Sequence, residues 1–461
     1  MIIGQRLKKL LPLLLIFSAC FLFEGEKEDE QNTNLTLSLH SAGVTSVNLN
    51  VEPEDSLSSF TFELVRDDST VQTLSLQSDT IIKDNGLNPN TNYTYTGYWM
   101  DGAERIGESN TLSVNTMDTT SHNFTWEIDT LGAYGSELND VWIVNENDIW
   151  VVGALSIDDS TLNYEGHINY NAAHWNGGDW DYLKIGDTMP QGHFAMTTLY
   201  GIHYFNENDI WVISGVPLHW NGEEWEHYLL HYMDVLPNSS LSNGALWGTS
   251  SNNMYFVGLN GSIVHYNGNE FVKMESGTDV DLRDISGNED GSRIFATGYL
   301  NTDGRYESVT VYYMQGEWSV LFSGSSYFGD IEQEDFGWMT TVDVFSDTCY
   351  IVSREGLIKY DFINESYSVV EPWQTRMNGE DFYGLTVQNT NDIMSFGRNG
   401  FTSHFNGKSW HRSKQIDLHQ KPAWIKNGQL KNNIAIRVGE LRNYNNLEKS
   451  GAIVCIGTRN N

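Results

Sequence analysis

Three aspartates each stand directly before an aliphatic residue at the start of a short apolar run: Asp140-Val141, Asp284-Ile285 and Asp343-Val344. Carboxylates gathered around one point could hold a cation such as Ca²⁺, or accept hydrogen bonds from sugar hydroxyls. A structural alternative is favoured over a ligand site, because a carboxylate at the start of a strand can accept hydrogen bonds from nearby backbone amides. These three residues are therefore the first candidates for a ligand site, with capping of strand amides as the competing interpretation.

Sequence motifs for known catalytic chemistry are missing from the chain. There is no GxSxG, no HExxH, no EF-hand loop and no glycine-rich turn of the kind that holds a phosphate at a helix start. Asp279-Val280-Asp281 matches a DxD pattern, but a three-residue pattern in so acidic a chain carries little information. We predict no catalytic residues.

Four histidines share a short motif in which an aromatic residue, Asn and Gly follow. They are His174, His219, His265 and His404. Zinc needs ligands about 2 Å from a common centre, whereas residues at one position of successive repeats lie around a ring. The motif therefore predicts packing within a repeat. We expect no bound metal and no required cofactor, with Ca²⁺ at the aspartates left open.

The elements that position these residues repeat along the chain. Asn147-Asp148-Ile149-Trp150-Val151 recurs as Asn208-Asp209-Ile210-Trp211-Val212, and weaker copies follow. Aligned positions in the copies, 150, 211, 255, 295, 350, 394 and 435, are 40 to 61 residues apart. This spacing is typical of four-stranded propeller blades. We predict seven blades, with six or eight open, and place the recurring tryptophans in the core between blades.

Residues 123–461 are accordingly predicted to form the propeller. Phe124-Thr125-Trp126-Glu127-Ile128 has the pattern of a lone outer strand, and the last unit, around 421–458, shows only three strands. Pairing the two would close the ring and remove an open edge.

The start of each innermost strand should then face the mouth of the central channel. Alignment of these starts places Asn139, Tyr200, Arg283 and Tyr383 at one position. Asp140, Asp284 and Asp343 follow at the next position. These seven residues are the predicted channel-mouth ligand site.

A smaller domain is predicted at residues 34–117. Runs such as Leu35, Leu37 and Leu39 alternate with polar residues, which is typical of strands with one buried face. About seven such runs fit a β-sandwich. Leu87-Asn88-Pro89-Asn90-Thr91-Asn92-Tyr93-Thr94-Tyr95 resembles the tyrosine corner of fibronectin type III domains, although the tryptophan typical of an early strand in that family is absent.

The N-terminus carries an export signal. Arg6, Lys8 and Lys9 precede a short apolar run, which is too short to span a membrane. Phe-Ser-Ala-Cys at 17–20 resembles a bacterial lipobox. Residues 1–20 are thus predicted to be a lipoprotein signal, with Cys20 the lipidated residue. Residues 21–33 are expected to be an acidic tether.

The chain has 61 acidic and 26 basic residues, for a net charge of −35. Such a surface repels phosphate backbones, so nucleic acid is not an expected partner. The expected location is the bacterial cell envelope, with lipid anchoring to a membrane, at the outer membrane or the cell surface.

The elements Asn-Asp-Val-Trp, Asn-Glu-Asn-Asp-Ile-Trp and Ala-Ala-His-Trp-Asn-Gly resemble propeller lipoproteins of Bacteroidota-like bacteria, some of which carry a glucosyltransferase label. Such a label implies little without a site. The missing catalytic motifs favour an anchored, non-catalytic protein that binds a glycan or protein ligand or acts as a scaffold. The alternative is a carbohydrate-active enzyme, of the glycosyltransferase or glycosidase kind, that uses the carboxylates at the channel mouth.

Overall fold

The computed structural model describes residues 35–53, 59–158, 167–188, 194–327, 336–372, 382–397, 400–413, 423–442 and 450–460. The predicted signal at 1–20, its Cys20 and the tether at 21–33 lie outside these ranges. The described residues are all-β, apart from the short 3-10 turn η1 at Leu259–Gly261. None of the described residues belongs to a helix with the length and hydropathy needed to cross a membrane.

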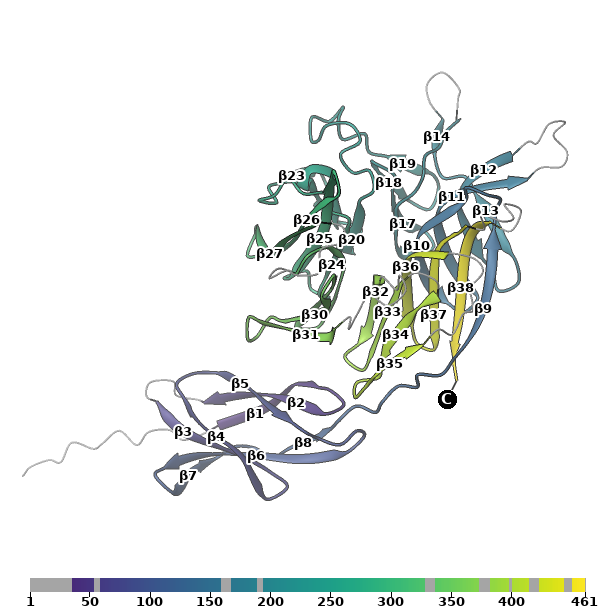
Figure 1. Cartoon of the computed structure of the whole chain (residues 1–461). Coiled ribbons are helices and arrows are strands. Elements are labelled where there is room, and N and C mark those ends of the chain that lie inside the picture. Colours follow the sequence, from purple (N-terminus) through teal and green to yellow (C-terminus); the bar gives the residue numbers. More distant parts are fainter. Residues whose placement is uncertain are drawn as a thin grey trace, which may run out of the picture. The chain divides into compact units, whose positions relative to one another are not determined.

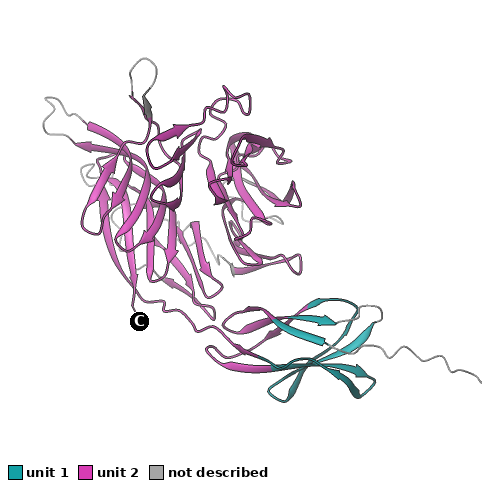
Figure 2. Ribbon diagram, turned by 180° about the vertical axis from the view of Figure 1, so that it is seen from behind, with its two compact units in different colours: residues 1–38, 50–80, 95–112 teal, residues 39–49, 81–94, 113–461 magenta. Residues whose placement is uncertain are grey.

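The chain forms two compact units (Figure 2). One contains residues 1–38, 50–80 and 95–112, and the other contains residues 39–49, 81–94 and 113–461. Because these units divide the first eight strands between them, the boundary predicted at 117–123 stays a prediction.

The first eight strands form two antiparallel sheets, β1-β2-β5 and β4-β3-β6-β7 with β8 beside β6. Alternate side chains are buried along them, as in β2, where Val47, Leu49 and Val51 are inaccessible to solvent. The strands are β1 Leu35–Ala42, β2 Ser46–Pro53, β3 Phe60–Arg66, β4 Ser69–Leu76, β5 Thr80–Asn85, β6 Asn92–Asp101, β7 Glu104–Glu108 and β8 Leu112–Asn115.

The segment that suggested a tyrosine corner contains the expected hydrogen bond. The backbone N–H of Asn88 donates to the hydroxyl of Tyr93 over 2.9 Å. A buried tryptophan, Trp99, lies on β6 and stacks on Phe60 with ring centroids 4.0 Å apart. Membership of the fibronectin type III family stays a prediction.

The remaining strands form a seven-bladed propeller, with four antiparallel strands in each blade (Figure 1). The first blade contains β10 Glu137–Asn145, β11 Asp148–Asp158, β12 His167–Trp175 and β13 Trp180–Leu183. The second contains β16 Gly201–Asn206, β17 Asp209–Ile213, β18 Pro217–Trp220 and β19 Trp225–His227. The third contains β20 Ala245–Ser250, β21 Asn253–Val257, β22 Ile263–Tyr266 and β23 Phe271–Met274. A small hairpin, β14 Asp187–Thr188 and β15 Phe194–Ala195, lies between the first two in sequence.

The fourth blade contains β24 Asp284–Gly287, β25 Ile294–Thr302, β26 Arg305–Met314 and β27 Glu317–Tyr327, and the fifth contains β28 Met339–Phe345, β29 Thr348–Ser353, β30 Gly356–Asp361 and β31 Ser366–Pro372. The sixth contains β32 Phe382–Asn389, β33 Asp392–Gly397, β34 Thr402–Phe405 and β35 Trp410–Ser413. The seventh contains β36 Ala423–Lys431, β37 Ile434–Leu441, β38 Gly451–Arg459 and β9 Phe124–Leu131.

The ring closes as the sequence predicts. Strand β9 pairs with β38 along its whole length, from Phe124 opposite Arg459 to Leu131 opposite Ala452. The first strands of neighbouring blades contact one another in order, and β36 contacts β10. The outer strand of the last blade therefore comes from the start of the propeller segment.

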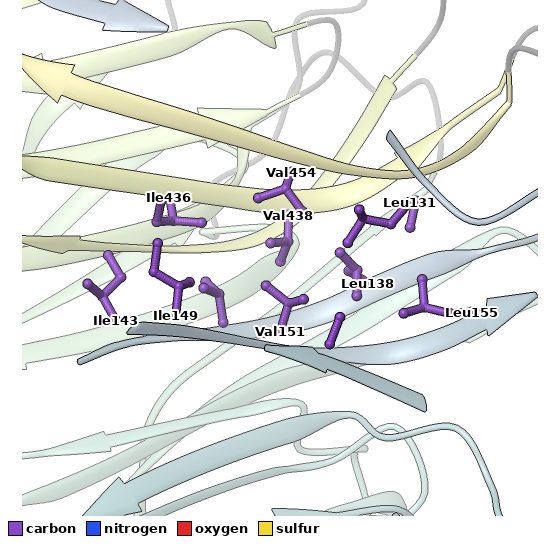
Figure 3. Close-up of a cluster of buried hydrophobic side chains, with 12 residues drawn as sticks. Leu131, Leu138, Ile143, Ile149, Val151, Leu155, Ile436, Val438 and Val454 are labelled. Carbon is purple, nitrogen blue, oxygen red and sulfur yellow. The ribbon is translucent and has the colours of Figure 1, made fainter. Parts of the chain in front are cut away.

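The hydrophobic core of the propeller lies between blades. Figure 3 shows one cluster, in which Ile436, Val438 and Val454 of the last blade meet Ile143 and Ile149 of the first. Trp211 is fully buried and packs against the next blade in a similar cluster. The prediction that the recurring tryptophans are core residues is thus confirmed for this position.

The His-aromatic-Asn-Gly motif links the second and third strands in four of the seven blades. His219 Nε2 lies 2.9 Å from Asp209 Oδ1, and the His219 ring stacks on Trp211. Ser251 of the next blade accepts the Trp211 indole N–H and donates to Asp209. His174, His265 and His404 have matching contacts with Asp148, Asn253 and Asp392. The packing interpretation of these histidines is therefore confirmed.

The turn chemistry of the motif differs from expectation. An Asn-Gly pair in a two-residue hairpin loop is typical of a type I′ turn, with positive φ at both residues, but here only glycine takes positive φ, with Gly177 at 92°. Asn176 instead accepts hydrogen bonds through Oδ1 from the N–H groups of Gly178 and Asp179. The asparagine side chain thus substitutes for a backbone acceptor in the turn.

Candidate functional site

A central cavity of about 1130 Å³ is lined by the starts of all seven first strands. All seven residues of the predicted channel-mouth site line it: Asn139, Asp140, Tyr200, Arg283, Asp284, Asp343 and Tyr383. The volume exceeds the range of about 300–1,000 Å³ that is common for small-molecule sites. The cavity therefore has room for a sizeable ligand.

Asp140 and Asp284 each bridge two neighbouring blades. Asp284 Oδ1 accepts the N–H of Ile285 at 2.9 Å, and Oδ2 accepts the N–H of Val342, on the next blade, at 3.0 Å. Asp140 bonds in the same way to Val141 and to Ile202 of the next blade. Both carboxylate oxygens are therefore occupied by backbone donors, as the capping interpretation predicts.

Asp343 makes bonds of the same kind, but at a different position of its strand. The alignment placed it level with Asp140 and Asp284, whereas the structure places Thr341 at that level and Asp343 two residues later. Thr341, not Asp343, precedes Val342, the residue whose N–H donates to Asp284. Asp343 instead accepts from Val344 and, through Oδ2, from Val387 of the next blade at 2.7 Å. The three carboxylates thus form two rows rather than one ring.

The same kind of bond continues with neutral side chains around the cavity. Ser286 and Thr386 each accept a backbone N–H of the following blade, from Val344 and Leu430 respectively. Asn427 donates to Asp140 Oδ1 over 2.8 Å and so links the last blade to the first. The polar inner surface is thus largely a set of inter-blade hydrogen bonds.

Burial raises the pKa of all three aspartates. The pKa is about 7 for Asp140, about 8 for Asp284 and about 6 for Asp343. Backbone hydrogen bonds lower each pKa and only partly offset the cost of removing the charge from water. For Asp284 the charges of Asp343 and Asp140 raise the pKa further.

The described residues contain no group of three His, Cys, Asp or Glu side chains arranged to hold a metal ion. The carboxylate oxygens that could bind Ca²⁺ already accept amide hydrogens. A Ca²⁺ site at the aspartates stays a prediction to which this geometry adds no support. Cys349 and Cys455 are buried, as expected for small strand residues, and burial raises the pKa of both thiols.

Two of the three Lys and Arg residues that line the cavity are bound to acidic neighbours. Lys426 Nζ lies 2.6 Å from Glu137 Oε2 and 2.9 Å from Asn139 Oδ1. Arg283 pairs with Asp281 at 3.3 Å, and its guanidinium lies 4.4 Å from the centroid of the Tyr299 ring. These cations are therefore already neutralised within the protein.

Sequence reasoning missed an aromatic group on one side of the cavity. Tyr299 and Tyr306 lie on the long β25–β26 hairpin, and Trp338 lies just before β28. Ring centroids of Trp338 lie 5.2 Å from both tyrosines and 5.3 Å from Tyr383. Strand length was a weak signal for this group, since β25 has nine residues where β17 and β21 have five, but β11 has eleven.

No protein-family model matches the chain, and no curated protein matches it. Among solved structures, the chain is similar to YCF48 bound to the D1 peptide, at 13% identity and a TM-score of 0.48, covering 74% of this chain and 97% of that one. It is also similar to the extracellular domain of a one-component system of B. thetaiotaomicron, at 11% identity and a TM-score of 0.45, covering 72% of this chain and 40% of that one.

A third similar structure is Raptor of Chaetomium thermophilum, at 12% identity and a TM-score of 0.41. It covers 73% of this chain and 29% of that one. At these identities the likeness extends to the fold alone. The strand pairing of the described residues by itself shows an all-β protein whose larger part is a seven-bladed β-propeller.

Proposed function

We propose that this chain is a lipid-anchored protein of the bacterial cell envelope that binds a ligand, without catalysis, in the central cavity of its propeller. The cavity carries the proposal: about 1130 Å³ of space is lined by residues from all seven blades. Its carboxylates are held by backbone amides rather than set free for acid–base chemistry.

A ligand that occupies the cavity should be excluded by a large side chain placed there. Ala245 lines the cavity and has the smallest side chain among the partly exposed lining residues of its strand. We expect Ala245→Trp to abolish ligand-induced thermal stabilisation in a screen of oligosaccharides and peptides. The matched variant Ala245→Ser should keep it. A ligand that stabilises both variants equally binds elsewhere and contradicts the cavity as the site.

The anchoring part of the proposal rests on the sequence at 17–20. We expect Cys20→Ser to move the protein from the membrane fraction to the soluble fraction, because the mature protein would lose its lipid. The check is fractionation of cells that express each form, with the propeller detected by antibody. A wild-type protein found in the soluble fraction would contradict lipid anchoring.

One observation favours the enzyme as a second candidate. The pKa of Asp284 is about 8, and a carboxyl group protonated at neutral pH is suited to act as a general acid. However, both of its oxygens face backbone N–H donors. We therefore prefer the binding role. Turnover of a glycoside that is lost in Asp284→Asn would favour the enzyme.

A further inference from the structure

The aromatic group of the cavity is a continuous surface. Trp338 lies at its centre, in contact with Tyr299, Tyr306 and Tyr383, and the Tyr299 and Tyr306 ring centroids are 5.8 Å apart. All four residues line the cavity, and all are half-buried. We call these four residues the aromatic wall. Their partial exposure distinguishes them from the fully buried Trp211.

The arrangement of the aromatic wall limits what it can bind. A cage for a quaternary ammonium group needs rings that stand apart around the cation. The rings here touch one another, at centroid distances of 5.2 to 5.8 Å, which leaves no space for a cation between them. Tyr299 and Tyr383 meet Trp338 at interplanar angles of 87° and 69°, so a flat ligand such as the apolar face of a sugar ring would stack on one ring of the group.

The charged side chains of the cavity are already engaged within the protein, including Arg354, which also lines it and has an interaction of its own. Arg283 is paired with Asp281 and Lys426 with Glu137. The carboxylates of Asp140, Asp284 and Asp343 are held by backbone amides. A charged ligand would have to break these contacts, at a cost in desolvation and lost hydrogen bonds.

Neutral polar groups, in contrast, remain available around the cavity. Asn301 uses only Oδ1 and Gln429 only Oε1 in hydrogen bonds, while the side chain of Asn243 makes none in the described part of the chain. The hydroxyls of Tyr299 and Tyr306 likewise have no hydrogen-bond partner among the described residues. Amides and phenols of this kind pair well with sugar hydroxyls, which both donate and accept.

From the aromatic wall and the free neutral groups beside it, we infer that the central cavity binds a neutral glycan, with a sugar ring stacked on Trp338 and its hydroxyls bonded to Asn301 and Tyr306. The inference rests on the proposed function, and it names the ligand class of the same cavity. The ring face is apolar and the ring edge is polar, and the aromatic wall and the free amides supply the matching surfaces.

The test measures binding of defined probes to the mature protein by titration calorimetry. The neutral probes are maltohexaose, cellohexaose, xylohexaose and mannohexaose, supported by an array of neutral glycans. The comparison probes are hexagalacturonate and a set of acidic and basic hexapeptides. We expect at least one neutral glycan to bind, and the acidic sugar and the peptides not to bind.

Variants then locate the contact. Trp338→Ala should weaken binding of the neutral glycan by about tenfold or more, equivalent to about 1.4 kcal/mol. Tyr306→Phe removes one hydroxyl, preserves the ring and should weaken binding several-fold without changing the melting temperature. Tyr232→Ala is the matched control, because Tyr232 is 78% exposed and does not line the cavity.

The outcomes separate this inference from the proposed function. If a peptide or polyanion binds and Ala245→Trp abolishes that binding, a neutral glycan is the wrong ligand class, while the cavity remains the binding site. Binding that Ala245→Trp does not affect would overturn both. If no neutral glycan binds, or if Trp338→Ala and Tyr306→Phe bind a glycan as the wild type does, the inference is wrong.

Discussion

Deletion of residues 123–131 is expected to make the protein aggregate and to lower its melting temperature strongly. Strand β9 pairs with β38 over eight residue pairs, from Phe124–Arg459 to Leu131–Ala452. Its loss leaves β38 with a row of unpaired N–H and C=O groups, which is a template for pairing with another chain.

The deletion also removes buried apolar surface. Phe124 and Leu131 are 7% and 4% exposed, and each contributes about 1.5–3 kcal/mol through burial. Trp126 covers the buried Arg437, whose guanidinium lies 3.7 Å from the centroid of the indole ring. The combined loss is a large part of the 5–15 kcal/mol by which domains are commonly stable.

Light scattering and thermal melts would measure the effect of the deletion. A synthetic peptide of residues 123–131, added during refolding, should restore the monomer, since it can pair with β38. A shortened protein that stays monomeric with unchanged melting would show that β9 is not needed to close the ring.

Replacement of Asp284 by Ala is expected to destabilise the propeller at pH 5.5 and to do so less at pH 9. The variant leaves the N–H groups of Ile285 and Val342 without their acceptor, at about 1–3 kcal/mol for each buried amide. Asp284→Asn keeps one acceptor oxygen, so its loss should be about half as large. Asp179→Ala, at an exposed position, is the control and should change stability by under about 0.5 kcal/mol.

The pH dependence follows from the raised pKa. The pKa of Asp284 is about 8 in the folded protein, well above the ordinary value of 3.8. Between these values the folded state holds a proton that the unfolded state has lost, so stability falls as pH rises from about 4 to about 8. Asp284→Ala and Asp284→Asn lack this contribution. The difference in free energy of unfolding between the wild type and each variant should therefore shrink at high pH.

Denaturant titrations of the three variants at both pH values would test this. If the deficit of Asp284→Ala grows from pH 5.5 to pH 9, the carboxylate is stabilised as an anion and the assigned direction of its pKa is wrong. If the deficit is absent at both pH values, the inter-blade bonds do not contribute to stability.

The sequence by itself determined the repeats, the strands within them and the closure of the ring. The reason is that these features are local: an Asn-Asp-Ile-Trp-Val run, a His-aromatic-Asn-Gly turn and the alternation of apolar residues specify a blade without reference to distant residues. Closure of the ring followed from the number of strands in the last unit, which was one strand short. The segment Phe124–Ile128 has the pattern of the strand that is missing from it.

The channel-mouth site was predicted in part. All seven residues line the cavity, because inner-strand starts must face the axis of a propeller. The position of Asp343 was wrong by two residues. Thr341-Val342 and Asp343-Val344 have the same polar-aliphatic pattern, and a shift of two residues keeps every side chain on the same face of a strand. Only the bonds from Asp284 to Val342 and from Asp343 to Val387 fix the register.

The role of the aspartates and the aromatic wall were decided by the tertiary structure. A carboxylate before an aliphatic strand has the same sequence pattern whether it faces a ligand or an amide of the next blade, and that amide belongs to a residue about 60 positions away. Tyr299, Tyr306, Trp338 and Tyr383 come from three blades and share no repeat position. Their meeting depends on the length of the β25–β26 hairpin and on the packing of blades around the axis, which are non-local properties that no single segment of the sequence contains.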